Sequence, residues 1–318
     1  MKTQENLIIL APMEGVLDAL MRSLLTSINS YDMCITEFVR VVDRLVPKHV
    51  FYKICPELHN QGLTSNNTPI RIQLLGQHPN WMAENAARAI ELGSKGIDLN
   101  FGCPAQTVNK SKGGAYLLKT PETIYRILSE VKSALDAETE VSAKIRLGFD
   151  DTGLLDEIVD AIVSANADLL TIHARTKRQG YKPPAYWQYI GKFCDKYDIN
   201  IVANGEIWSK EDAENCQRVS QTSNLMLGRG ALALPNLANV IKHNDRPMPW
   251  NDMCALLMKY SQLELKSSKS FYYSSRVKQW LRYLKLQYPQ AEVLFQQIKR
   301  FDDKQSILDT IKELHLAA

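Results

Sequence analysis

Two hydrophobic periods alternate along most of the chain. Short runs of β-branched and other apolar residues predict eight strands, at 7–10, 33–36, 70–74, 96–99, 141–145, 169–172, 200–203 and 224–227. Between most of them lie longer segments whose apolar residues recur at i, i+3, i+4 and i+7, as in 80–93, 120–135 and 156–167. We predict amphipathic helices there, with N-terminal caps at Asn80, Thr120 and Asp156.

Continuous apolar strands that alternate with helices indicate parallel strands buried on both faces. Eight such units in about 240 residues predict an α/β fold, a (β/α)8 TIM barrel. An open, doubly wound sheet is the alternative, because one missed strand would change the architecture. After prolines 235, 247 and 249 only helical patterns remain. We therefore predict a barrel domain over residues 1–243 and a smaller, all-helical C-terminal domain over 244–318.

Composition narrows the class of protein. The 318 residues are 45% hydrophobic and 23% charged, which excludes a disordered or fibrous chain. No apolar run approaches the roughly 18 residues of a membrane span, so we expect a cytoplasmic protein without a membrane partner. The six cysteines form no CxxC pair, which argues against a zinc site and a disulfide framework. A net charge of +3 is too small to indicate a polyanionic partner by itself.

Polar residues follow the predicted strands at the ends where such barrels build their active sites. In chain order they are Pro12, Met13 and Glu14; Gln73; Asn100 and Cys103; Lys144 and Arg146; His173 and Arg175; Asn204, Gly205 and Glu206; and Gly228, Arg229 and Gly230. Their shared position predicts that they surround one site.

The segment "LGRGAL" after the last strand is typical of a phosphate site. Its glycines let backbone N–H groups approach an anion, Arg229 adds positive charge, and a helix N-terminus would follow. The glycines could instead serve only a tight turn. Because barrels commonly hold phosphate after strands seven and eight, we favour a phosphorylated cofactor.

The sequence leaves more than one role open for each of three side chains. Lys144 could be a paired core lysine, could stabilise negative charge on a reduced flavin, or could form a Schiff base. His173 could be structural or could contact a cofactor. Cys103 lies between glycine and proline in a loop, and a thiol with a reference pKa of about 8.5 can either donate a proton or act as a nucleophile. The other five cysteines are most simply small buried apolar residues.

Six segments together resemble the motif series of the tRNA-dihydrouridine synthases, in order and spacing: "APMEG", "DLNFGCPAQTVNKSKGGAYLL", "KIRLG", "HARTKRQGY", "ANGEI" and "GRGAL". The resemblance runs from the first strand into the C-terminal helices. "APMEGVLD", "CITEFVRVVD" and "SSRVKQWLRYL" further resemble the bacterial C-type enzymes, which act on the D-loop uridine at tRNA position 16. Phe101 and Ala105 differ from the residues that other members often carry.

The resemblance implies a tightly bound FMN, NADPH as reductant, and saturation of the C5–C6 bond of a tRNA uridine. Hydride from the flavin would reach C6, and Cys103 would protonate C5. The residues that the resemblance assigns to FMN are Pro12, Met13, Glu14, Gln73, Lys144, His173, Asn204, Gly205, Glu206, Gly228 and Arg229.

The C-terminal segment 266–300 carries eight lysines and arginines against one glutamate, a local charge of +7. In its helical pattern Val277, Leu281, Leu284 and Tyr288 share one face, and Lys278, Arg282 and Lys285 form a stripe beside it. Such a stripe is usually a solvated face, but it can also bind RNA phosphates. By resemblance the tRNA contacts are Arg40, Asn100, Tyr181, Arg276, Lys278, Tyr283 and Lys299.

We expect a monomer without a metal.

Two other classes of protein remain open from the sequence. A small-molecule flavin enzyme of the dihydroorotate dehydrogenase-like barrel class would share the phosphate site but would not need the basic appendage. A non-catalytic RNA-binding protein would explain the appendage but not the Cys103 loop.

Overall fold

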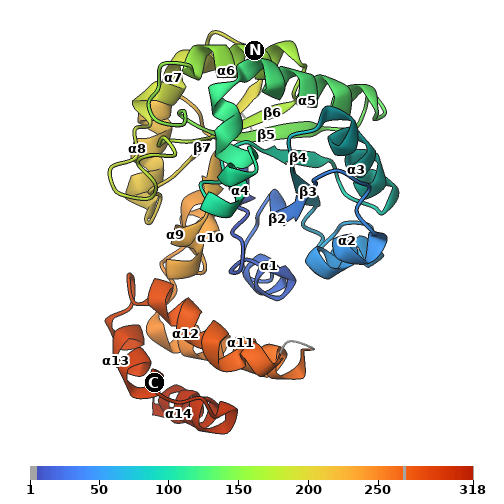
Figure 1. The fold of residues 1–318 in the computed structure, drawn as a ribbon. Helices are drawn as coiled ribbons and strands as arrows, with labels where there is room; N and C mark the ends of the chain where they lie inside the picture. Colours follow the sequence, from blue (N-terminus) through green and yellow to red (C-terminus); the bar gives the residue numbers. More distant parts are fainter. Residues whose placement is uncertain (1–5, 268–269, 318) are drawn as a thin grey trace.

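Eight parallel strands close into a barrel in the computed structural model, which describes residues 6–267 and 270–317 (Figure 1). The strands are β1 Ile8–Leu10, β2 Met33–Arg40, β3 Ile70–Leu75, β4 Ile97–Asn100, β5 Val141–Arg146, β6 Leu169–His173, β7 Asn200–Asn204 and β8 Leu225–Leu227. β8 pairs with β1, with Met226 opposite Ile9. The predicted (β/α)8 barrel is therefore confirmed, and the open sheet is excluded.

One strand is longer than the sequence pattern predicted. β2 continues to Arg40 instead of ending near Thr36, and a register shift between Ile35 and Phe38 separates its two halves. Glu37 interrupts the apolar run at that point, so the second half lacks the pattern of a buried strand. The extension carries Glu37 and Phe38 to the mouth of the barrel.

The helices around the barrel begin within about two residues of the predicted starts, but without the predicted side-chain caps. They are α1 Ala19–Thr26, α2 Lys48–Ile54, α3 Pro79–Glu91, α4 Gln106–Lys110, α5 Pro121–Ser133, α6 Leu155–Ser164, α7 Gln188–Cys194, α8 Lys210–Ser220, α9 Arg229–Ala233 and α10 Leu237–His243, with 3-10 turns η1 Pro56–Asn60 and η2 Gly114–Lys119. α3 and α5 start at prolines, which already have a helical φ and lack the N–H that a cap would satisfy. Thr120 is the N-cap residue of α5, as predicted, but its side chain makes no cap hydrogen bond. Asn80 and Asp156 are not caps, because they lie in the first turns of α3 and α6.

The barrel interior divides into an apolar and a polar part. Alternate strand residues point outward into the main core beneath the helices, as Ile72, Ile97 and Ala143 do. Inside, a small apolar cluster that includes Ile9 and Val202 fills one side. Most interior residues of β3 to β6 are instead polar, and the buried ones include Arg71, Gln73, Asp98, Ser142 and Thr171. Hydrogen bonds join Gln73, Asp98 and Ser142 into a network beneath the barrel mouth.

Four helices and a short turn follow the barrel and gather on one side of it (Figure 1). They are α11 Trp250–Lys266, η3 Ser270–Tyr272, α12 Tyr273–Leu284, α13 Pro289–Ile298 and α14 Lys304–Ala317. The helix pattern that predicted one segment as far as Tyr288 is wrong at its end, because Pro289 starts α13 and disfavours a helical residue before it. Tyr288 is nevertheless buried, and its hydroxyl donates to the Met248 carbonyl over 2.9 Å. None of the described helices is both long enough and apolar enough to cross a membrane.

Two side chains of α12, Trp280 and Arg276, contact the barrel. Trp280 is buried, and its Nε1 donates to the carbonyl of Leu232 in α9 over 3.1 Å. Arg276 places Nη2 at 2.9 Å from the carboxylate of Asp18, the residue that caps α1, and also pairs with Glu264 of α11. These contacts hold one end of α12 over the barrel mouth.

Candidate active site

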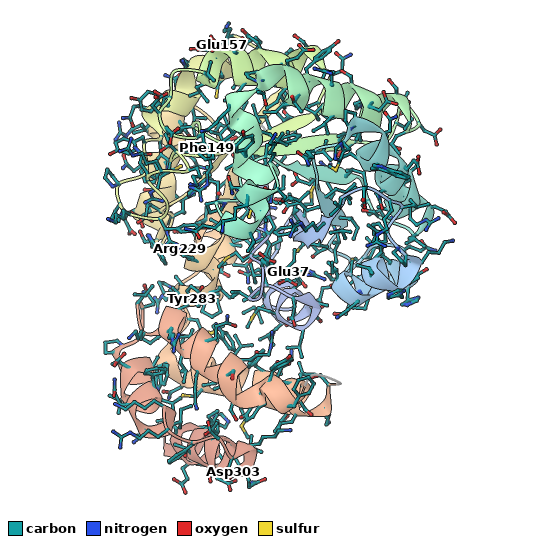
Figure 2. The ribbon with its side chains drawn as sticks, viewed as in Figure 1. Glu37, Phe149, Glu157, Arg229, Tyr283 and Asp303 are labelled. Atoms are coloured by element: carbon teal, nitrogen blue, oxygen red, sulfur yellow. The ribbon has the colours of Figure 1, made fainter. Side chains whose placement is uncertain are left out.

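A cavity of about 530 Å³ opens at the carboxyl ends of the barrel strands. It is lined by every residue that the sequence assigned to FMN: Pro12, Met13, Glu14, Gln73, Lys144, His173, Asn204, Gly205, Glu206, Gly228 and Arg229. Asn100, Cys103 and Tyr181 also line it, as does Tyr283 from α12. Figure 2 shows Arg229, Tyr283 and Glu37 around the region where the barrel meets the C-terminal helices. Cavities of this size hold small molecules and cofactors.

Lys144 places a buried positive charge in the wall of the cavity. Its Nζ donates to Oδ1 of Asn204 over 3.0 Å, and Nδ2 of Asn204 donates to the Met226 carbonyl over 2.8 Å. Burial, followed by the neighbouring Arg146, lowers the pKa of Lys144 to about 8, although Asp98 opposes the shift. The ammonium is therefore cationic at pH 7 and can stabilise negative charge in the cavity.

His173 has a free polar atom at the cavity wall. Burial, Arg146 and Lys144 hold its pKa well below the ordinary value, so the imidazole is neutral at pH 7. Its Nδ1 is buried and has no hydrogen-bond partner among the described residues. Gly205 has φ +115°, and a Cβ there would stand 3.0 Å from Cδ2 of the ring, so a glycine is required beside His173.

Arg229 belongs to a charged group at the end of β7 and β8. Oε1 of Glu206 lies 2.8 Å from Nη2 of Arg175 and 2.7 Å from Nη2 of Arg229. Burial opposes ionisation of Glu206, but hydrogen bonds from Trp208 and Arg175 outweigh it and lower the pKa of the carboxyl. Two arginines against one carboxylate leave a net charge of +1, which suits an anion.

The predicted phosphate loop has two kinds of glycine. A Cβ on Gly230 would lie 2.0 Å from the carbonyl oxygen of Ile207, so Gly230 is required for packing. At Gly228 a Cβ would meet nothing closer than Sδ of Met13 at 3.5 Å, so this backbone faces the cavity. The helix that follows is only five residues long, and the positive charge comes mainly from Arg229.

The loop that carries Cys103 is held by side-chain amides. Oδ1 of Asn100 accepts from the backbone N–H groups of Gly102, at 3.0 Å, and Cys103, at 2.8 Å. The Cys103 carbonyl accepts from Nδ2 of Asn109 at 2.9 Å and from the backbone of Ala115 at 3.1 Å. Burial raises the pKa of the thiol, so Cys103 is protonated at neutral pH. This geometry favours a proton donor over a thiolate nucleophile.

The remaining cysteines lie away from this cavity. Cys34, Cys55, Cys216 and Cys254 are buried, and Cys194 is half-buried in α7. The described residues contain no group of His, Cys, Asp and Glu side chains arranged for a metal ion.

The residues assigned to tRNA fall into two groups. Three of them border the cavity: Asn100 in its wall, Tyr181 exposed at its rim, and Tyr283 from α12. The Tyr181 ring lies 5.1 Å from the guanidinium carbons of both Arg146 and Arg229. A flat aromatic surface therefore stands at the cavity mouth.

The other four lie outside the cavity. Arg40 is exposed at the end of β2 and donates to Oγ of Ser111 over 2.7 Å. Arg276 is only 13% exposed between its two carboxylates, and Nζ of Lys278 donates to the Phe301 carbonyl over 2.6 Å. Lys299 is exposed beside Gln296. Lys269, part of the basic run, is outside the described residues.

Glu37, Phe38 and Trp208 also line the cavity and were not predicted, whereas Arg146 was placed at the site without a role. Arg146 also organises the loops, since Nε donates to the Gly102 carbonyl over 2.9 Å and Nη1 to the Gly180 carbonyl over 2.9 Å. Its spacing of two from Lys144 on one strand was a usable signal, because both side chains face the same side. Glu37 and Phe38 had no such signal, since the strand pattern ended before them.

Comparisons with known proteins agree with this arrangement. The family model described as "Dihydrouridine synthase (Dus)" matches residues 9–317. A tRNA-dihydrouridine(16) synthase of Vibrio parahaemolyticus is 52% identical over 306 residues, 96% of this chain and 95% of the relative. Proteins of the same name from Shewanella oneidensis and Escherichia coli strain K12 are 52% and 49% identical over 96% and 97% of this chain, and over 97% and 98% of their own lengths. A match that covers nearly the whole chain and nearly the whole of each relative places this protein in the dihydrouridine synthase family.

Proposed function

We propose that this protein reduces the uridine at position 16 of tRNA to 5,6-dihydrouridine, with FMN bound at the barrel mouth and NADPH as the reductant. The observation that carries the proposal is the protonated thiol of Cys103, which lines the same cavity as the buried Lys144 and the charged group around Arg229. The names of the relatives support the substrate and the position.

The residues present fit FMN. A flavin ring has carbonyl and nitrogen acceptors along its edge, and Nζ of Lys144 keeps N–H donors beyond its bond to Asn204. The partnerless Nδ1 of His173 offers a further polar contact. Arg229 would hold the phosphate, beside the cavity-facing backbone of Gly228. Pro12, Met13, Glu14, Gln73, Gly205 and Glu206 would line the remainder.

Reduced FMN supplies a hydride when bound, and the chain must supply the proton that completes the reduction of the C5–C6 bond. Cys103 would donate this proton to C5, because its thiol stays protonated at neutral pH and lines the same cavity. Lys144 would hold positive charge near the flavin ring. The hydrogen bonds that the backbone N–H groups of Gly102 and Cys103 donate to Asn100 would keep the loop in place as the proton leaves.

The tRNA would lie across the mouth between the barrel and the helices. Tyr181 would stack on a base at the rim, and Tyr283 would extend the contact from α12. Arg40, Asn100, Arg276, Lys278 and Lys299 complete the proposed contacts, although Arg276 and Lys278 would first have to exchange partners within the chain. We propose residues 1–243 as the catalytic domain and 244–318 as the tRNA-binding domain.

The test is to map dihydrouridine in tRNA from a strain that lacks this gene, before and after complementation. The complemented strain should regain dihydrouridine at position 16, and complementation with a Cys103→Ala variant should restore far less. Restoration at position 20 instead would contradict the proposed specificity. Absence of any restored dihydrouridine with soluble, flavin-loaded protein would contradict the proposed activity.

A further inference from the structure

A buried carboxylate lies one layer below the cavity. Asp98 on β4 is fully buried and does not line the cavity. Its Oδ2 accepts from Nε2 of Gln73 over 2.7 Å, and its Oδ1 accepts from Oγ of Ser142 over 2.6 Å. Burial raises the pKa of the Asp98 carboxyl, whereas the hydrogen bonds from Gln73 and Ser142, followed by the charges of Lys144 and Arg71, favour its ionised form.

These bonds form a series that ends at the catalytic loop. Nε2 of Gln73 faces Asp98, and the ionised form of the carboxyl, which only accepts hydrogen bonds, favours this direction of the amide. The Gln73 carbonyl oxygen then faces Asn100 and accepts from its Nδ2 over 2.8 Å. Oδ1 of Asn100 consequently faces the loop and accepts the backbone N–H groups of Gly102 and Cys103.

We propose that Asp98 is a positioning residue for the reaction, because it fixes the direction of two consecutive amides and through them the place of the Cys103 thiol. The inference rests on the proposed function in one respect, the role of Cys103 as the proton donor. Asp98 itself touches neither the cavity nor the thiol. Reversing either amide would turn an N–H donor of Asn100 toward two backbone N–H donors, which cannot bond to it.

A second effect of Asp98 must be separated from this one. Its negative charge raises the pKa of Lys144 against the larger effect of burial. A substitution that removes the charge but keeps the acceptor distinguishes the two. Asp98→Asn can present its carbonyl oxygen to Gln73 and its NH₂ to Oγ of Ser142, whose own proton can go to the Ile97 carbonyl at 3.2 Å. Asp98→Ala removes both the acceptor and the charge.

The experiment measures alkylation of Cys103 by iodoacetamide in the full chain across pH 6 to 10, with mass spectrometry of the Cys103 peptide. This readout needs neither flavin nor tRNA. Asp98→Ala should change the alkylation rate about 5- to 30-fold, as expected when one to two neutral hydrogen bonds of the loop are lost. Asp98→Asn should stay within about twofold of the parent, because the series of amides is kept.

Thr171→Val is the matched control. Thr171 is a buried interior residue of β6, opposite Lys144 in the sheet, and its hydroxyl has no hydrogen-bond partner among the described residues. This variant disturbs the same polar interior without breaking the series, so its alkylation should match the parent. If Asp98→Ala does not fold, Gln73→Met breaks the series one residue later, with Asp98 still present, and should give the same change.

The outcomes decide between the alternatives. Alkylation of Asp98→Ala at the rate of the parent overturns the inference, and so does an Asp98→Asn variant that behaves like Asp98→Ala, since charge would then be the cause. A Cys103→Ala enzyme that is reoxidised by tRNA at the parent rate would overturn the role of the thiol, and it would leave the alkylation result standing.

Discussion

Replacing Cys103 by Ala should separate reduction of the flavin from reduction of the tRNA. The substitution removes the thiol but keeps the loop, because Asn100 and Asn109 bind its backbone and not its side chain. FMN should therefore remain bound and should still be reduced by NADPH. Transfer to tRNA should slow, because no other assigned group gives the proton to C5.

The size of the defect follows from the setting of the thiol. General acid catalysis contributes about 10²- to 10⁴-fold. Cys103 is half-buried at an open cavity, so water can reach the position that the thiol leaves. We therefore expect the lower half of that range, about 10²- to 10³-fold, which corresponds to roughly 2.7–4 kcal/mol of activation free energy. Cys103→Ser should recover little, since a hydroxyl is a much weaker acid than a thiol.

The assay is a single-turnover experiment. The flavin is reduced without oxygen, unmodified tRNA is added, and return of the oxidised flavin spectrum is followed. Cys194→Ala is the control, because Cys194 is also half-buried but lies in α7, outside the cavity. Reoxidation of Cys103→Ala at the parent rate would refute the proposed acid, and loss of FMN from this variant would show that the loop binds the cofactor.

Three further substitutions test the other parts of the site. Arg229→Ala should weaken FMN binding about 10- to 100-fold in a flavin titration, as expected for one charged hydrogen bond, and an unchanged affinity would contradict the phosphate placement. Arg276→Ala should destabilise the chain by about 1–3 kcal/mol in urea unfolding, because it removes the charge between two carboxylates at the joint with α1; equal unfolding midpoints would contradict this. Converting Lys278, Arg282 and Lys285 to Ala should lower the salt slope of tRNA binding by about 0.7–0.9 per lost phosphate contact, and an unchanged slope would identify a solvated face.

The barrel was predictable because its signal is local. Each predicted run of apolar and β-branched residues became a strand, because the outward-facing residues of every strand are buried beneath the helices even where polar residues face the interior. The helix start after Thr120 was predicted correctly, whereas the predicted caps at Asn80 and Asp156 lie within the first turns of α3 and α6. Pro121 sets the start of its helix by its own fixed φ, and no cap is needed.

The site was predictable to the extent that it depends on strand ends. Lys144 and His173 line the same cavity because parallel strands end on the same side of a barrel. The environment of Arg276 could not be read from its own helix, since Asp18 belongs to a distant segment of the chain. The direction of the Gln73 amide was equally hidden, because it depends on Asp98 in the neighbouring strand.

Burial shifts the pKa values of Cys103 and Lys144 in opposite directions, and this predicts which of the two groups limits the reaction at high pH. It raises the pKa of the Cys103 thiol, so the acid form persists beyond the ordinary range, and it lowers the pKa of Lys144 to about 8. As pH rises, the lysine therefore loses its charge before the thiol loses its proton. The single-turnover rate should fall on the alkaline side near pH 8, and Lys144→Arg, which stays charged, should move that limb upward toward the thiol. If the alkaline decline of the rate stays near pH 8 in Lys144→Arg, the titration of another group causes it.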